Sequence, residues 1–246
     1  QATHQAGLDM TFECVGPCTY RLIHKAYYDC CGGATQGSLP IPNNGVPNPV
    51  NSVNWTGIPV GCSPLPRITV NWSVAPGGVL DVTPVCGSVQ TTCTSPGTAG
   101  LICGIMEATQ IAEYDVCGAS GSIPCTAYRF GWGSCCRNGV ITSGAANAGL
   151  GTNNTIIDLS VTPCNNSPAF LEPPISFICL PNAGQVQTYN QGAVDPDGDS
   201  LAYRLVTCKG QAGATSVTYT AGGGFSFRQP LGSTWNITMD PFTGDI

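Results

Sequence analysis

The cysteine content constrains this chain more than any other feature of its sequence. There are 15 cysteines among 246 residues, and no two of them form a C-x₂-C pair. Zinc knuckles and thiol redox motifs depend on such pairs, and the chain has only two histidines, His4 and His24, to supply other ligands. The cysteines therefore predict disulfides formed in an oxidising compartment, and they exclude an ordinary cytosolic enzyme.

Spacing alone does not reveal how the cysteines pair. Cys14 and Cys18 flank a short turn and could close the tip of a hairpin. The adjacent cysteines at 30–31 and 135–136 would each bond to a different neighbour, because a ring between adjacent residues is strained. Because the number is odd, at least one cysteine lacks a partner within this chain, and it could bond to another chain or to a further part of the protein. All 15 are candidate disulfide residues: Cys14, Cys18, Cys30, Cys31, Cys62, Cys86, Cys93, Cys103, Cys117, Cys125, Cys135, Cys136, Cys164, Cys179 and Cys208.

Composition excludes further classes. Eight Lys and Arg against 14 Asp and Glu give a net charge of -6, which leaves no basic face for nucleic acid. A hydrophobic content of 42% argues against disorder. No apolar run reaches the roughly 18 residues that a membrane span needs, so we expect no membrane insertion. We also expect that a secreted form has already lost its signal peptide, with Gln1 at or near the mature N-terminus.

Hydrophobic alternation predicts an all-β chain. Residues 8–15 and 20–28 alternate around a Gly-Pro turn and predict a hairpin, and residues 68–74 and 156–161 predict two further strands. Residues 105–114 have a helix-like composition, but their glycine-bracketed, β-rich surroundings favour a strand. The proline-rich residues 32–66 predict an extended surface loop with at most edge strands, since proline cannot donate to a sheet ladder.

A change in composition predicts two domains. Fourteen of the 15 cysteines precede residue 180, whereas acidic residues concentrate after residue 190. The asparagine- and proline-containing stretch around residues 165–174 looks like a linker. We therefore expect a disulfide-rich β-sandwich at 1–165 and a second β-sandwich at 166–246.

Three carboxylates at alternate positions suggest a Ca²⁺ site. Asp195, Asp197 and Asp199 lie around Gly198, and hard oxygen ligands at this spacing suit Ca²⁺, although no EF-hand loop is present. Asp240 and Asp245 could approach the same place. The alternative is a solvated acidic turn between strands. We take Asp195, Asp197, Asp199 and Asp240 as the candidate metal ligands.

No catalytic residues are predicted. A Ser-His-Asp triad needs a histidine, and His24 alternates with Leu22 and Ala26 along a strand, as a structural histidine would. None of the familiar hydrolase or phosphate-binding motifs occurs. The four tryptophans are candidates for stacking on sugar rings, although core positions are more usual for this residue: Trp55, Trp72, Trp132 and Trp235.

Three stretches together resemble a family. They are residues 4–14 running on to 30, the Cys-Cys-Arg-Asn stretch at 135–138, and residues 166–203 with their Asp-Pro-Asp-Gly-Asp-Ser-Leu motif. In this order they resemble the N-terminal region of large secreted surface proteins of Bacteroidota, which usually end in a gliding-motility-associated domain read by the type IX secretion system. The last stretch also looks like a cadherin-like or Ig-like repeat that lacks its closing strand. This implies a longer protein, or a strand supplied by a neighbour.

The expected function follows from these features. We expect a non-enzymatic extracellular structural or adhesive protein on the cell surface, part of a larger fibre or adhesin stiffened by Ca²⁺. Its expected partners are other copies, further domains of the same protein, and glycans. A carbohydrate-binding module is the alternative, and a fragment of a secreted hydrolase is a third and weaker one.

Overall fold

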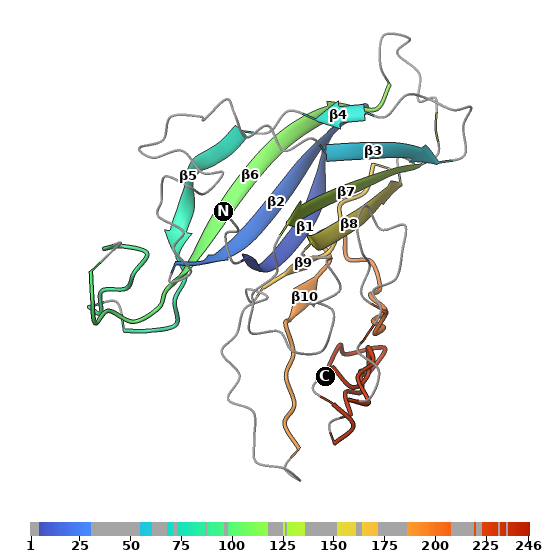
Figure 1. Cartoon of the computed structure of the whole chain (residues 1–246). Helices are drawn as coiled ribbons and strands as arrows, with labels where there is room; N and C mark the ends of the chain where they lie inside the picture. The colour runs from blue at the N-terminus through green and yellow to red at the C-terminus, as the bar shows by residue number, and fades with distance from the viewer. Residues whose placement is uncertain are drawn as a thin grey trace.

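The structure is a computed structural model, and β-strands make up all of its regular secondary structure (Figure 1). It describes residues 5–30, 55–60, 68–70, 73–86, 88–95, 98–117, 125, 127–135, 152–160, 164–171, 186–207, 219, 223–230, 232–234 and 236–246. Over these ranges no helix forms, and so none has the length and apolarity to cross a membrane. The all-β prediction is therefore confirmed for this part of the chain.

The first sheet contains the predicted hairpin. Strand β1 (Gln5–Gly16) pairs antiparallel with β2 (Thr19–Asp29), and β2 pairs with β6 (Ile105–Asp115). The edge strand β5 (Ser73–Asp81) completes the order β1-β2-β6-β5. The segment with helix-like composition is thus a central strand, as its surroundings predicted. On the outer face, Arg21 lies between Glu13 and Glu113 in this register, and its guanidinium is 2.9 Å from Glu113 Oε1.

The second sheet has the order β4-β3-β7-β8. It consists of β3 (Trp55–Val60), β4 (Ile68–Val70), β7 (Ala127–Cys135) and β8 (Thr152–Ser160). The expectation of at most edge strands between residues 32 and 66 is wrong for β3, which has neighbours on both sides. Pro59 is tolerated because the pairing with β4 ends at Gly57, so only β7 lies beside the proline.

Residues 68–74 do not form the single strand that was predicted. Ile68–Val70 is β4 of the second sheet, whereas β5 (Ser73–Asp81) is the edge of the first sheet. The chain therefore changes sheets within this segment. Alternation along a sequence shows which faces are apolar, but it carries no information about which sheet a strand joins.

The two sheets pack face to face as a β-sandwich. Met10, Phe12, Tyr20 and Leu22 of the first sheet share one buried cluster with Tyr128 and Phe130 of the second. The Tyr114 ring meets both Tyr128 and Phe130 edge-on, with centroids 5.6 Å apart in each pair. Burying aromatic side chains of this size is worth roughly 1.5–3 kcal/mol each, so this cluster is a main source of stability.

Disulfides connect parts of the chain that are distant in sequence. Cys14 bonds to Cys164, Cys18 to Cys117 and Cys30 to Cys93, at sequence separations of 150, 99 and 63 residues. The expectation that Cys14 and Cys18 bond to each other is wrong, because each of them reaches a separate distant segment. These bonds indicate an oxidising environment.

The status of the remaining cysteines varies. Cys103 and Cys125 are also disulfide-bonded, and Cys86 is exposed and free, as an odd number of cysteines requires of at least one. Cys135 ends β7, but its side chain is outside the described set. The others lie outside the described residues: Cys31, Cys62, Cys136, Cys179 and Cys208.

The C-terminal part of the chain has little ladder structure in the residues described. Its strands are β9 (Ala169–Phe170) and β10 (Ala193–Val194), which pair antiparallel (Figure 1). The ends of this part are held by reciprocal hydrogen bonds between the backbones of Tyr189 and Ile246. Six of the exposed large apolar side chains lie here: Phe170, Leu171, Val186, Val194, Val206 and Phe242.

Candidate functional site

The edge of β1 is covered by the segment that follows Cys164. Beside the Cys14–Cys164 disulfide, Ser167 pairs with Phe12 through its backbone N–H, which donates to Phe12 O at 3.0 Å. The Ser167 hydroxyl oxygen accepts the Phe12 N–H at 2.8 Å, and Ser167 is only 6% exposed. The open backbone of an edge strand is thereby satisfied over this stretch.

The acidic motif forms a tight turn. The Asp195 carboxylate accepts the backbone N–H groups of Asp197 at 2.9 Å and Asp199 at 3.2 Å, while Gly198 N–H donates to Asp195 O at 3.2 Å. Gly198 has a φ of 82°, a left-handed conformation that glycine adopts without a steric penalty. Asp195, the first of the predicted metal ligands, therefore uses its carboxylate to stabilise the turn in which it lies.

The acidic turn also holds the covering segment. Asn166 donates to Asp197 twice, from its backbone N–H at 2.7 Å and from Nδ2 at 2.9 Å, and its Oδ1 accepts the Cys14 N–H at 2.8 Å. Asn165 Nδ2 donates to Asp199 at 3.1 Å. We call these contacts of Asn165 and Asn166 with Asp197 and Asp199 the clasp. It links β1, the covering segment and the acidic turn.

Asp240, the fourth predicted metal ligand, organises a second turn. Its Oδ1 accepts the backbone N–H groups of Phe242 at 2.8 Å and Thr243 at 2.9 Å, and these bonds lower the pKa of the Asp240 carboxyl. Asp245 instead accepts a hydrogen bond from Asn190 Nδ2 at 2.8 Å. The predicted ligands thus bond to neutral amides within their own surroundings.

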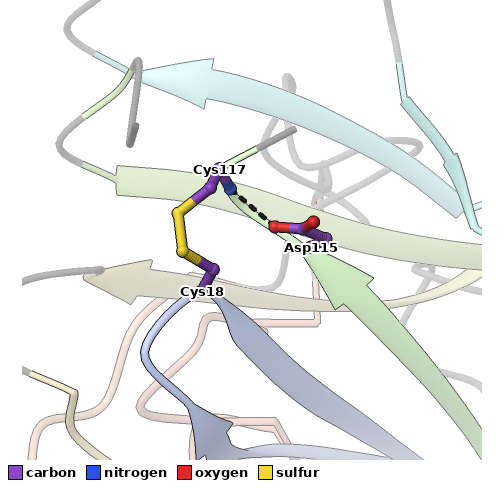
Figure 2. A group of neighbouring side chains, drawn as sticks. All are labelled: Cys18, Asp115 and Cys117. Atoms are coloured by element: carbon purple, nitrogen blue, oxygen red, sulfur yellow. Dashed lines mark hydrogen bonds between the residues drawn. A yellow bond between two sulfur atoms is a disulfide. The ribbon is translucent and has the colours of Figure 1, made fainter. Parts of the chain in front are cut away.

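One group of three potential metal ligands lies close together in the described structure. It consists of Cys18, Asp115 and Cys117, whose ligand atoms lie within 4.8 Å of one another, and the four aspartates predicted for Ca²⁺ form no such group there. Figure 2 shows that the two sulfurs are bonded to each other and that Asp115 accepts the backbone N–H of Cys117, at 2.9 Å. A disulfide offers no thiolate to a metal, so this group is a structural staple.

A histidine and a glutamine are buried together in the first sheet. His24 is 0% exposed, and its Nδ1 lies 3.3 Å from Gln110 Oε1 on the neighbouring strand. Burial lowers the pKa of the His24 imidazole to about 4, against a smaller opposing effect of Gln110. The ring is therefore neutral at physiological pH and has no access to a substrate, as expected of a structural histidine.

A polar cluster lies on the other face of the same strands. Lys25 Nζ lies 3.5 Å from Glu107 Oε1, and Glu107 is only 7% exposed. Burial raises the pKa of Asp9 even though Lys25 opposes the effect, and it raises the pKa of Tyr27 together with the negative charge of Glu107. The opposite charges of Lys25 and Glu107 are close enough to pair, which is typical of a structural network.

Two adjoining hollows flank residues 200–206. One, of about 560 Å³, lies between this segment, β1 and the acidic turn, and the other, of about 430 Å³, lies on the side of Met239 and Ile246. The two hollows share Phe170, Ala193, Ala202 and Tyr203, so they adjoin along this segment, and we call the two together the groove.

The side chains of the four tryptophans predicted to stack on sugars lie outside the described set. Trp55 begins β3 and Trp132 lies in β7, but their side chains fall outside the described set, and Trp72 and Trp235 lie outside it entirely. Sequence reasoning missed Asn165, Asn166 and Ser167 as contact residues, because it assigned them to a linker. The available signal was their position directly after Cys164, which fixes the segment to a partner cysteine.

Comparison of the chain with protein-family models, with curated proteins and with solved structures found no match. The geometry described above therefore carries the functional argument.

Proposed function

We propose that the protein is a non-enzymatic structural or adhesive component of an extracellular surface, built on a disulfide-stapled β-sandwich and acting as part of a larger fibre or adhesin. The observation that carries the proposal is the set of disulfides that join segments 63 to 150 residues apart. A protein exposed outside the cell without chaperones benefits from such bonds, because they restrict the unfolded chain most when they close long loops.

Other features support a structural role over an enzymatic one. Among the described residues, the carboxylates predicted as ligands bond to amides, and the buried His24 is enclosed in the sheet. Six of the eleven exposed large apolar side chains among the described residues lie on the C-terminal part, where contacts with other domains or copies would cover them. The resemblance to surface proteins of Bacteroidota and to cadherin-like repeats belongs to this proposal as well.

Assembly is the property to measure. The protein is produced with its disulfides formed, and sedimentation velocity and negative-stain electron microscopy are run over a rising concentration series. We expect ordered, stoichiometric association that is lost after reduction. A monomer at every concentration, together with turnover of a polysaccharide or peptide substrate that persists through purification, would overturn the proposal.

Calcium stiffening is a separate part of the proposal. No three of the four aspartates have carboxylate oxygens within 4.8 Å of one another, so Ca²⁺ would have to exchange some of the amide contacts of Asp195, Asp197 and Asp240 for its own coordination. Thermal melts in millimolar Ca²⁺ and in EDTA test it, with Asp197→Asn beside the wild type. A melting temperature raised by Ca²⁺ in the wild type alone supports a site at this turn, and identical melts remove calcium from the proposal.

A further inference from the structure

The segment that follows the acidic turn has the pattern of a strand but no ladder. Residues 198–207 run without a turn or bend, and the side chains of 201–207 alternate between half-buried and exposed. Leu201, Tyr203 and Leu205 face inward, whereas Ala202, Arg204 and Val206 are exposed. This is the period of a strand with one covered face, yet the segment belongs to no sheet.

One edge of this segment has no backbone partner among the residues that the structure describes. The Tyr203 N–H donates to Pro241 O at 3.0 Å, so that edge faces the C-terminal residues. In an extended chain, successive N–H groups point to opposite edges, and the amides of Ala202, Arg204 and Val206 therefore point the other way. These three amides have no acceptor among the described residues. An unpaired edge of this kind is a template for another strand.

The residues of the open edge also line the groove. Ala202, Arg204 and Val206 contribute to its smaller hollow together with Phe170 and Met239, which provide apolar walls. An extended peptide laid along the edge would place alternate side chains against these walls while its backbone pairs with the open amides.

The charge of the larger hollow selects the occupant. Asp9, Asp195 and Asp199 line it, and no Lys, Arg or His does so among the described residues. Within the part of the chain that the structure describes, the carboxylates of Asp195 and Asp199 accept hydrogen bonds from neutral amides and from no charged donor, so their negative charge is not neutralised by those contacts. A basic side chain is therefore the complementary group.

We propose that the groove along residues 200–206 binds an extended, basic peptide segment of a partner protein by strand addition, with a Lys or Arg side chain in the hollow between β1 and the acidic turn. The main chain supplies affinity through the open amides, and the carboxylates select positive charge. The groove would bind such a segment whether or not the protein assembles into fibres.

Synthetic peptides test the main-chain part without changing the protein. The probe is a nine-residue peptide that alternates Val and Thr and carries two Lys at one end, measured by fluorescence anisotropy. Two derivatives carry N-methyl groups on alternate residues, in one register or in the other. We expect one register to weaken binding at least about tenfold and the other to bind nearly as the parent does, because only one set of N–H groups faces the segment. Equal binding of all three peptides would refute strand addition.

Charge is tested with a matched peptide and matched variants. Replacing the two Lys by Glu should weaken binding by about tenfold or more, and the difference should shrink at high salt. Asp9→Asn with Asp199→Asn should reproduce this loss for the Lys peptide. Glu13→Gln with Glu113→Gln removes the same charge from two residues that do not line the groove, and should leave affinity unchanged. Equal effects of the two pairs would overturn the assignment of the acidic hollow.

The position of the bound peptide on the protein can be mapped by NMR. On binding of the Lys peptide, the backbone amide resonances of Ala202, Arg204 and Val206 should shift in ¹H–¹⁵N spectra, and their hydrogen exchange should slow. Perturbation confined to other residues, or no binding of the Lys peptide at millimolar concentration, would refute the proposal. Because the wild-type protein is used here, the result does not depend on whether an aspartate variant folds.

Discussion

The buried His24 side chain should make the fold sensitive to acid. The ring is 0% exposed, it lies between Met10 and Gln110 in the register of the first sheet, and burial lowers its pKa to about 4. In the unfolded chain the same imidazole is hydrated and titrates near 6.5. The two states therefore bind protons differently in the interval between these values.

The sign and size of the effect follow from this difference. Above about pH 6.5 the histidine is neutral in both states and contributes no pH dependence. As the pH falls from 6.5 towards 4, the unfolded chain binds a proton that the folded chain excludes, so the free energy of unfolding decreases. At about 1.4 kcal/mol per pH unit, the full interval corresponds to about 3 kcal/mol, all of it lost once the pH is below 4.

Urea unfolding at several pH values between 7.5 and 4.5 measures this contribution. Carboxylates also titrate at the lower end, so the informative quantity is the difference between the wild type and His24→Gln, which keeps a polar side chain but cannot be protonated. The free energy of unfolding that His24→Gln loses relative to the wild type at pH 7.5 should be about 2 kcal/mol smaller at pH 4.5. The matched control is His4→Gln, which removes the chain's only other histidine. Parallel pH profiles for the wild type and His24→Gln, or a profile flattened by His4→Gln instead, would refute the reasoning.

Three further variants probe a disulfide, the hydrogen bonds of Asn166 and the packing around Gly104. Cys14→Ser with Cys164→Ser removes a bond that spans 150 residues and should lower the free energy of unfolding by about 4 kcal/mol in urea melts, whereas unchanged stability would mean that the unfolded chain is not restricted by this bond. Asn166→Ala deletes the side-chain hydrogen bond to Asp197 and the bond from the Cys14 N–H, while the backbone N–H of residue 166 can still donate to Asp197, so we expect a loss of about 2 kcal/mol and faster hydrogen exchange at Cys14; exchange as slow as in the wild type would contradict the link between Asn166 and β1. Gly104→Ala places a Cβ 2.7 Å from the Cys93 sulfur and should cost about 1–3 kcal/mol by thermal melting, and a melt equal to that of the wild type would show that the neighbouring side chains can move aside.

The strands that sequence predicted well are those with one covered face. Residues 8–15 and 20–28 alternate clearly because their even-numbered side chains, such as Phe12 and Leu22, enter the core, while the odd-numbered ones lie on the opposite face and, apart from Tyr27, are half-buried or exposed. Residues 105–114 looked helical for a physical reason. The first four residues of β6 are all buried, Glu107 among them, so the alternation disappears where both faces of the strand are covered.

The features that sequence could not predict depend on contacts between distant residues. The pairing of Cys14 with Cys164 requires knowing that the covering segment returns to the edge of β1, which no local pattern encodes. The candidate site shows the same limit. Spacing identified the carboxylates of the acidic turn as oxygen donors, but not that Asn166, 31 residues away in sequence, would bond to Asp197.

The disulfide at the edge of β1 also determines how the molecule would respond to mechanical force. Tension applied between β1 and the residues that follow Cys164 passes through one sulfur–sulfur bond and does not stretch the chain between the two cysteines, which are 150 residues apart in sequence. At about 3.4 Å per extended residue, that bond hides roughly 500 Å of contour length from the pulling axis. Single-molecule pulling should therefore show a short extension for the oxidised protein, and the hidden length should appear only after a reductant is added.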